Sequence, residues 1–438
     1  MEKFLHAPRL CGAVRAPSSK SEAHRTLIVA ALSALYGGET SVRRVRCTDL
    51  NQDIEATARC LCALGAEITR EGEDYLVTPI TTLPREAVLD CGESGSTLRF
   101  LLPVCCALGA TAGAPEGFTV SLVGHGRLPE RPLSPLYEEL VAHGAILSPM
   151  GSNPLVVQGK LTHGRYRLSG NVSSQFISGL LFALPLLKGD SEIEIYSLVE
   201  SEGYIRMTYE AVTRVVREIM AAHPVYFKII GRSHRSMRAF PEEELTVGGD
   251  WSGAAFFLTA GVLGQEGTSV TVMGLDMESS QGDKAIVDIL RRMGGQIEVG
   301  TEGHLTARPS RLRACVIDAA QVPDLVPILA VAASVAEGET RIVGAARLRL
   351  KESDRLKTVS DMISALGGDI TETDDGLIIR GVPRLKGGIV DAAGDHRIAM
   401  SGAVAATACN GCVTVVGAES VAKSYPTFWE EFGRLTKE

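Results

Sequence analysis

The chain has 438 residues, of which 45% are hydrophobic and 22% charged, and its net charge is −8. This is a globular composition, and the length predicts two domains of about 200 residues each. The acidic balance and the 5% of aromatic residues argue against a nucleic-acid-binding protein. No apolar run reaches the roughly 18–20 residues of a membrane-spanning helix. With no secretory leader pattern and ten scattered cysteines, we expect a cytoplasmic protein with reduced thiols.

One pattern recurs six times along the chain. Each copy runs through a helix rich in Ala, Leu and Gly, reaches a small-residue turn and enters a β-branched segment. The copies recur roughly every 70–80 residues, which indicates a repeat architecture. They begin at Ser21, Ser94, Ser173, Ser252, Pro323 and Gly394.

A second helix, amphipathic and ending in glycine, recurs between these copies. Its glycines suit the left-handed position that closes many helices. We therefore expect each unit to run strand, buried helix, strand, strand, amphipathic helix, strand, which predicts a mixed α/β (α+β) fold with three βαββαβ units in each domain. Examples of the second helix are residues 56–68, 137–147, 286–297 and 359–370.

Cations gather at the starts of the buried helices, where helix stability favours acidic residues. Lys20 and Arg25 lie at the first helix, Arg99 at the second and Arg397 at the sixth. Because helix N-termini also attract anions, this pattern predicts a small anionic ligand. The alternative is that each cation pairs with a nearby carboxylate.

Further charged residues lie in predicted loops. Two of them are carboxylates among cations, Asp324 and Glu352, and a carboxylate there can act as a general acid or base. Alternatively, Asp324 caps a helix after Pro323, and Glu352 forms an exposed i,i+3 pair with Arg355. The loop cations are Arg127, Lys351, Arg355 and Lys423.

Common nucleotide, metal and hydrolase motifs are absent from the sequence: there is no GxxxxGK[ST], GxGxxG after a strand, HExxH or GxSxG. His24 and His396 are expected to be polar wall residues rather than metal ligands. We predict no metal and no organic cofactor.

Nine segments resemble, in order, the motifs of the 5-enolpyruvylshikimate-3-phosphate synthase family. The resemblance covers essentially the whole chain. It implies two similar domains around pseudo-threefold axes, 20–248 and a discontinuous 1–19 plus 249–438, with the active site in the cleft between them. The segments are PSSKSEAHR (17–25), CGESGSTLRFLLP (91–103), GHGRLPERP (124–132), NVSSQFISGLL (171–181), SSQGD (279–283), PD (323–324), LKESDRLK (350–357), GDHRIAM (394–400) and AKSYPTFW (422–429).

The resemblance implies transfer of the enolpyruvyl group of phosphoenolpyruvate to the 5-hydroxyl of shikimate 3-phosphate, a step of chorismate and aromatic amino acid biosynthesis, by a monomer. Asp324 would accept the hydroxyl proton, and Glu352 with Lys20 would protonate the methylene carbon. Arg99 and Tyr204 would lie beside the substrates. Shikimate 3-phosphate would be held by Lys20, Ser21, Arg25, Ser173, Ser174, Gln175, Ser201, Asp324 and Lys351, and phosphoenolpyruvate by Lys20, Gly95, Arg127, Gln175, Arg355, Arg397 and Lys423.

The chain departs from the family pattern at several positions. Ser18 replaces a glycine, Glu93 an asparagine and Ser96 a threonine, and Arg347 aligns where some members carry asparagine. Glu93 either weakens phosphoenolpyruvate binding or points away from it. The third repeat is blurred over 222–240, which lacks the glycine expected after its helix.

Two other functions compete with this interpretation. The UDP-N-acetylglucosamine 1-carboxyvinyltransferase family is expected to carry a cysteine in the loop matching 116–132, where this chain has none. A non-catalytic repeat scaffold for an acidic partner would not require Asp324 and Glu352 together with the cations.

Overall fold

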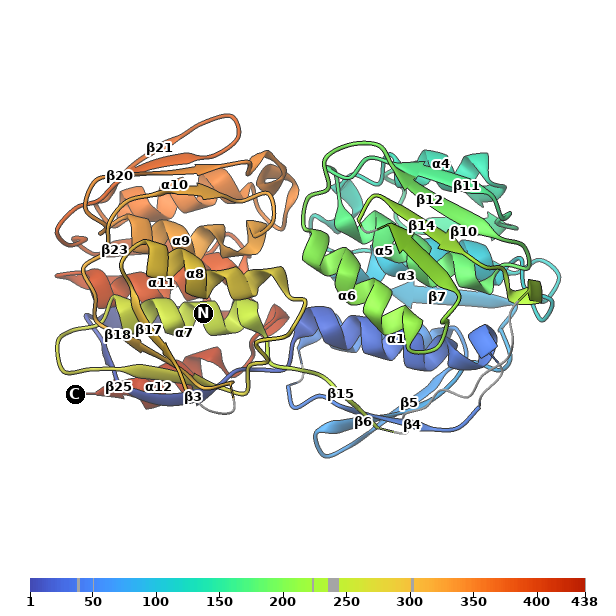
Figure 1. Cartoon of the computed structure of the whole chain (residues 1–438), viewed down its shortest axis with the longest axis horizontal. Coiled ribbons are helices and arrows are strands. Elements are labelled where there is room, and N and C mark those ends of the chain that lie inside the picture. The colour runs from blue at the N-terminus through green and yellow to red at the C-terminus, as the bar shows by residue number, and fades with distance from the viewer. Residues whose placement is uncertain (38–39, 50, 223, 235–243, 301–302, 438) are drawn as a thin grey trace. The chain divides into compact units, whose positions relative to one another are not determined.

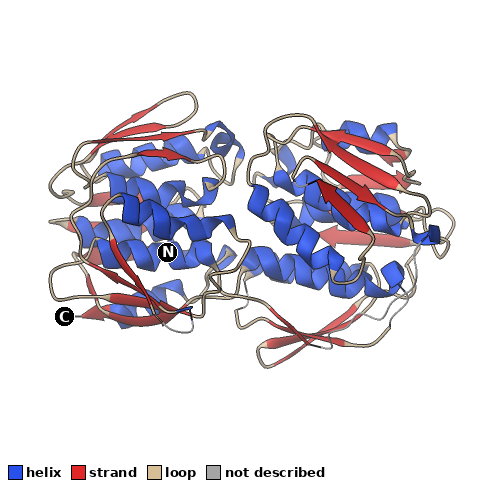
Figure 2. Cartoon of the chain, in the orientation of Figure 1, coloured by secondary structure: helices blue, strands red, loops and turns tan. Residues whose placement is uncertain are grey.

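The computed structural model describes residues 1–437 except 38–39, 50, 223, 235–243 and 301–302. The described chain forms two compact units, Met1–Ser19 with Gly248–Glu438 and Lys20–Val247. The chain therefore passes between units at residues 19–20 and 247–248, whereas the sequence placed the second crossing one residue later. Helices and strands alternate throughout both units (Figures 1 and 2).

The unit Lys20–Val247 contains, in its described part, three four-stranded sheets, each accompanied by two helices. The first sheet is β15 (Glu244–Thr246), β4 (Arg43–Arg46), β6 (Asp74–Thr78) and β5 (Glu67–Glu71), with α1 (Lys20–Gly37) and α2 (Gln52–Ala63). The second is β7 (Glu86–Asp90), β8 (Thr119–Val123), β10 (Leu155–Gly159) and β9 (Ala145–Leu147), with α3 (Gly95–Leu108) and α4 (Leu136–Ala142). The third is β11 (Arg165–Leu168), β12 (Ser191–Ile195), β14 (Tyr226–Ile229) and β13 (Ile219–Ala222), with α5 (Ser174–Ala183) and α6 (Glu202–Thr213).

The other unit, over its described residues, has two four-stranded sheets, one of three strands and one of two strands. The first is β17 (Gln296–Val299), β18 (Leu305–Arg308), β16 (Val270–Met273) and β3 (Gly12–Arg15), with α7 (Trp251–Val262) and α8 (Ile286–Arg292). The second is β19 (Val316–Asp318), β20 (Glu339–Val343), β22 (Leu377–Arg380) and β21 (Asp369–Glu372), with α9 (Val326–Ala333) and α10 (Arg355–Ala365). The third is β1 (Glu2–His6), β24 (Cys412–Val416) and β23 (Gly388–Asp391), with α11 (His396–Ala405). The two-stranded sheet is β2 (Arg9–Leu10) with β25 (Thr436–Lys437), and α12 (Phe428–Leu435) directly precedes β25.

The α/β fold class is confirmed, but the order of elements within a unit differs from the prediction. β7, α3, β8, α4, β9 and β10 follow one another, so the order is βαβαββ rather than βαββαβ. β7 and β8 pair in parallel across α3, as a crossover helix permits, and β10 then pairs antiparallel with both β8 and β9. The sequence predicted two strands between the buried and the amphipathic helix, whereas only β8 and the turn Leu128–Glu130 lie between α3 and α4, and both β9 and β10 follow α4.

The two helix types are confirmed. Every residue of α7 and α9 is buried, whereas α2 and α10 each have a buried face and a polar face. The glycine after α2, Gly65, has φ +110°, and a Cβ there would lie 2.4 Å from the carbonyl oxygen of Thr82. Only glycine therefore lets α2 turn into β5.

The blurred third repeat still forms a hairpin, because β13 and β14 pair antiparallel; residue 223 and residues 235–240 of this region lie outside the described residues. Among the helices that are described, none is long and apolar enough to cross a membrane.

Candidate active site

Lys20 opens α1 and pairs with a carboxylate from another helix. Its Nζ lies 2.9 Å from Oδ2 of Asp53, in the first turn of α2, and both side chains are about one-sixth exposed. The pairing alternative therefore holds for Lys20. Sequence reasoning missed Asp53, because an acidic first turn is common in helices and marks no site by itself.

Arg25 is buried and joins α1 to α6. Its Nε donates to the hydroxyl of Thr208 at 2.7 Å, and its Nη1 and Nη2 donate to the carbonyl oxygens of Ser21 at 2.6 Å and Tyr204 at 2.8 Å. Burial lowers the pKa of Arg25 to about 10, so it remains a cation at neutral pH. Ser201, the residue before α6, is buried with φ +54°.

The starts of α3 and α5 are linked by one hydrogen-bonded chain. Arg99 Nη1 donates to Oε1 of Gln175 at 2.9 Å, and Gln175 Nε2 donates to the hydroxyl of Ser96 at 2.9 Å. The serine found in place of threonine at position 96 therefore still serves as an acceptor. Ser173 caps α5 by accepting from the Gln175 amide, and Ser174 beside it is buried.

The loop with Arg127 is held differently. Arg127 is exposed, directly before a short helical turn, Leu128–Glu130. A Cβ at Gly95 would lie 2.7 Å from Nη1 of Arg131, and a Cβ at Gly126 would lie 2.9 Å from the carboxyl carbon of Glu93. Glu93 therefore lies against the residue that precedes Arg127, rather than pointing away from this loop.

His24 is a buried polar wall residue, as expected. Its Nδ1 lies 2.7 Å from the hydroxyl of Thr57, which in turn lies 2.7 Å from that of Thr97. Burial, together with the charges of Lys20 and Arg25, lowers the pKa of His24 well below its ordinary value, so the ring is neutral. Over the residues that the structure describes, no group of His, Cys, Asp and Glu could hold a metal ion.

In the other unit, Asp324 is surrounded by three cations. Its Oδ1 lies 2.9 Å from Nη1 of Arg355 and 3.5 Å from Nζ of Lys351, and its Oδ2 lies 3.2 Å from Nη2 of Arg397. Arg397 also donates to the backbone carbonyl of Asp324 at 3.1 Å. Asp324 lies within the turn Pro323–Leu325 and does not cap α9, so the capping alternative is wrong.

Arg355 is the centre of this charged cluster. Its guanidinium reaches Asp395 at 2.8 Å, Asp324 at 2.9 Å and Glu352 at 2.5 Å, and its side chain is 1% exposed. Burial opposes the charged form, but the three carboxylates outweigh it and raise the pKa of Arg355. The i,i+3 pair with Glu352 exists, but its arginine is buried and Glu352 precedes α10, so it is not an exposed helical pair.

Further contacts and one shifted pKa complete the description of the cluster. Burial lowers the pKa of Lys351 to about 8, and Lys423 Nζ donates to the carbonyl of Gly394 at 2.8 Å. Asp395 is fully buried and caps α11 through the amide of Arg397. Arg347, to which the sequence assigned no contact, donates to the carbonyl of Ala320 at 2.7 Å.

Sequence reasoning missed two buried carboxylates here, Asp395 and Asp283. Burial and the charge of Asp324 raise the pKa of Asp283 to about 6, and its carboxylate accepts a hydrogen bond from Ser252. Both residues lie inside quoted motifs, GDHRIAM and SSQGD. A polar residue inside an otherwise small or apolar motif could have marked them.

Six repeated units, with cations near the starts of α1, α3 and α11, define an α/β protein suited to small anions. A model of the EPSP synthase (3-phosphoshikimate 1-carboxyvinyltransferase) family matches residues 6–432. A Clostridium kluyveri protein named 3-phosphoshikimate 1-carboxyvinyltransferase is 41% identical over 433 residues, covering 98% of this chain and 96% of that protein. One of the same name from Clostridium acetobutylicum is 40% identical over 438 residues, covering 97% and 95%. The chain therefore belongs to the EPSP synthase family.

Solved structures show the same fold. EPSP synthase from Acinetobacter baumannii has a TM-score of 0.77 at 24% identity, covering 100% of this chain and 98% of that one. An enolpyruvyl transferase from Streptomyces tendae has a TM-score of 0.74 at 19% identity, covering 99% and 97%. At these identities the likeness concerns the fold alone.

Proposed function

We propose that the chain transfers the enolpyruvyl group of phosphoenolpyruvate to the 5-hydroxyl of shikimate 3-phosphate and releases phosphate, as the names of its relatives indicate. The observation that carries the proposal is the carboxylate of Asp324, held by Arg355, Arg397 and Lys351. A carboxylate among cations can take a proton from a hydroxyl while the cations hold the anionic reactants.

In the addition step, the 5-hydroxyl oxygen forms a bond to C2 of phosphoenolpyruvate and its proton passes to Asp324. The electron pair of the C2–C3 double bond takes a proton from Glu352, with Lys20, so that the methylene becomes a methyl group. The product of this step is a tetrahedral ketal phosphate. In the elimination step, the C2–O bond to phosphate breaks, a methyl proton returns to Glu352, and the electron pair of that C–H bond forms the C2–C3 double bond again. The departing phosphate takes up the proton held by Asp324.

Shikimate 3-phosphate is assigned to the groups at the starts of α1, α5 and α6. Ser173, Ser174 and Ser201 offer hydroxyls or amides beside helix N-termini, which favour phosphate. Arg25 adds a positive charge whose position is fixed, because its guanidinium already donates three hydrogen bonds within the protein. The full set is Lys20, Ser21, Arg25, Ser173, Ser174, Gln175, Ser201, Asp324 and Lys351.

Phosphoenolpyruvate is assigned to the remaining cations. Its phosphate and carboxylate together carry more negative charge than Asp324, so they offset Arg355 and Arg397 and leave the Asp324 carboxylate freer to accept a proton. Glu93 lies against the Arg127 loop, and its charge reduces the affinity of that loop for an anion. The full set is Lys20, Gly95, Arg127, Gln175, Arg355, Arg397 and Lys423. We propose that the enzyme acts as a monomer in the cytoplasm.

Phosphate release from phosphoenolpyruvate by the pure, metal-free protein tests this proposal. We expect release with shikimate 3-phosphate and none without it. Release only with UDP-N-acetylglucosamine would assign the chain to the other enolpyruvyl transfer reaction. No release with either acceptor would favour a non-catalytic scaffold.

A further inference from the structure

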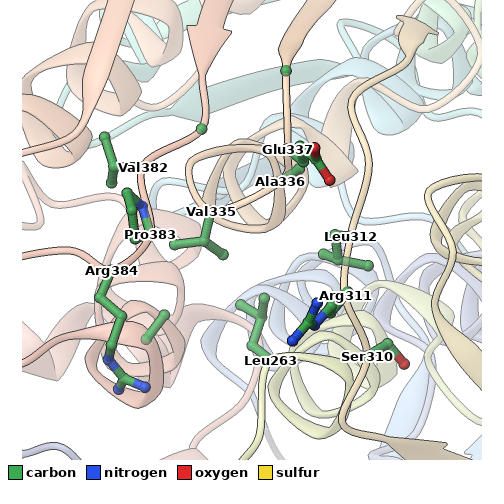
Figure 3. A pocket seen from close by; sticks show the side chains of 13 residues that line it. Leu263, Ser310, Arg311, Leu312, Val335, Ala336, Glu337, Val382, Pro383 and Arg384 are labelled. Carbon is green, nitrogen blue, oxygen red and sulfur yellow. The ribbon is translucent and has the colours of Figure 1, made fainter.

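A cavity of about 580 Å³ opens in the unit Met1–Ser19 with Gly248–Glu438 (Figure 3). None of the residues of the charged cluster lines it. Its volume lies within the roughly 300–1,000 Å³ of small-molecule sites. All of its lining residues belong to this unit, so it is complete within one compact body. No residue that the proposed reaction uses lines it.

The cavity lies where three buried helices end. Leu263 directly follows α7, Val335 comes two residues after α9, and Ala408 ends the helical turn that continues α11. The charged cluster lies at the starts of α9 and α11, with Asp324 and Arg397. At 1.5 Å per residue the ten residues of α11, which runs from the cluster toward the turn at the cavity, span about 15 Å, which is the scale of the separation.

Backbone hydrogen bonds fix the walls of the cavity. The Ser310 amide donates to the carbonyl of Val262 at 3.0 Å, and the Val382 amide donates to that of Ser334 at 2.8 Å. The amide of Leu385 donates to the carbonyl of Ala408 at 3.1 Å. Each helix end is thereby tied to a neighbouring segment of the wall, so the cavity is formed before any ligand binds.

The lining combines an apolar floor with charged groups of both signs. Leu312 is buried, and Leu263, Val335 and Val382 are partly exposed to the cavity. Arg384 is already bound, since its Nη2 donates to the carbonyl oxygens of Thr407 and Cys409.

The other two charges are the informative ones. Within the described part of the chain, the side chains of Arg311 and Glu337 form no ion pair, either with each other or with another residue. In the view of Figure 3, the Glu337 carboxylate lies on one side of Val335 and Leu312, and the guanidinium groups of Arg311 and Arg384 lie on the other. The cavity thus presents two separated, opposite charges around one apolar floor. This arrangement is complementary to a ligand that carries two opposite charges on an apolar body.

We propose that this cavity binds a small amphipathic zwitterion, an α-amino acid with a bulky apolar side chain. Its carboxylate would pair with Arg311, whose planar guanidinium suits a carboxylate, and with Arg384. Its ammonium would face Glu337 and the negative ends of α7 and α9. Its side chain would cover Leu263 and Val335. The proposal is independent of the reaction assigned to the charged cluster.

Calorimetric titration of the full-length protein tests the ligand class with four probes. L-phenylalanine carries all three features, 3-phenylpropionate lacks the ammonium, phenethylamine lacks the carboxylate and glycine lacks the apolar body. We expect L-phenylalanine to bind with a Kd near or below about 1 mM. Each single-charge analogue should bind about three- to fivefold more weakly, since an exposed ion pair contributes modestly. Glycine should show no binding.

Variants of the two informative charges then locate the site. Glu337→Gln should weaken L-phenylalanine about three- to fivefold and leave 3-phenylpropionate unchanged, whereas Arg311→Gln should weaken both. The control Glu298→Gln, which removes a charge paired with Arg308 elsewhere in the same unit, should change neither. Val335→Phe should abolish binding by filling the floor.

Three outcomes would overturn the proposal. They are absence of L-phenylalanine binding up to about 10 mM, equal affinity for 3-phenylpropionate, or unchanged binding in Glu337→Gln and Arg311→Gln together. Because all four titrations are done without phosphoenolpyruvate or shikimate 3-phosphate, they do not depend on catalytic activity.

Discussion

Asp324 is the residue on which the proposed chemistry depends most. Asp324→Asn keeps the size of the side chain and its hydrogen-bonding oxygen but removes the charge that accepts the proton. We expect kcat to fall about 10²–10⁴-fold, the usual contribution of a general base, while the Kd for shikimate 3-phosphate changes only a few-fold. Single-turnover kinetics with calorimetry would measure both.

The matched control is Asp361→Asn, which removes an exposed carboxylate paired with Lys357 on α10 in the same unit. It should leave turnover unchanged. Near-normal turnover in Asp324→Asn would remove Asp324 from the acid–base role.

Replacement of Arg397 is expected to affect the two substrates unequally. It is buried and bonds both the side chain and the backbone of Asp324, and we assign it to phosphoenolpyruvate. Arg397→Ala should raise the KM for phosphoenolpyruvate about 10- to 100-fold, as expected for a lost charged hydrogen bond, and the KM for shikimate 3-phosphate much less. Arg380→Ala, which removes an exposed arginine, is the control. Equal effects on both substrates would contradict the assignment.

If Lys351 binds substrate as we propose, its charge makes binding depend on pH. Its pKa of about 8 means that its charge is present below pH 8 and is lost as the pH rises through that value. An anion that needs this charge should therefore bind about tenfold more weakly at pH 9 than at pH 7. Calorimetry with shikimate 3-phosphate measures the slope. Lys351→Arg, which stays charged, should flatten it, and an identical slope in both proteins would exclude Lys351 as the source.

Part of the site's cations could be predicted from the sequence because they occupy unfavourable positions at helix starts, namely Lys20, Arg25, Arg99 and Arg397. Their partners could not. Lys20 pairs with Asp53 and Arg355 with Asp395, and these pairs join segments 33 and 40 residues apart in the chain. Such pairing depends on how helices pack, which local pattern does not record. Likewise, Asp324 after Pro323 looks like a helix cap until the three cations around it are seen.

At the scale of elements, two glycines near β5 separate backbone strain from steric conflict. Gly65 has φ +110° and no room for a Cβ, whereas Gly72 has φ +62° and nothing within 4 Å of one. Gly65→Ala should cost about 3 kcal/mol or more, because the methyl group meets a carbonyl oxygen. Gly72→Ala should cost only about 1–2 kcal/mol, the penalty of the left-handed conformation. Urea unfolding measures both, and equal losses would refute the steric argument.

The helices of the repeat were predictable, since composition alone separates the all-apolar type from the amphipathic type. The strand order was not. In the last repeat the expected hairpin is replaced by β1, the first strand of the chain, which pairs antiparallel with β24. In the first repeat the outer strand is β15, which pairs in parallel with β4 although about 200 residues separate them. Local alternation indicates a strand but not its neighbour.

At the scale of the whole molecule, the unit Lys20–Val247 keeps every strand of its three described sheets within its own bounds. We expect the fragment 20–247 to fold by itself with a cooperative urea transition. Removing residues 244–247 should weaken it, because β4 then loses its parallel partner and Arg46 loses its ion pair with Glu244. A fragment 20–247 without a cooperative transition would show that this unit depends on the other.

That the chain passes twice between the two units has a consequence for folding during synthesis on the ribosome. Residues 2–6 emerge roughly 400 residues before β24, their partner, which is about 20–80 s at 5–20 residues per second. The segment Lys20–Val247 is synthesised long before β24 and can fold while β1 still has no partner strand. Exposed strand edges invite pairing with other chains. The nascent protein therefore needs a chaperone most during the interval between the synthesis of the segment Lys20–Val247 and the synthesis of β24.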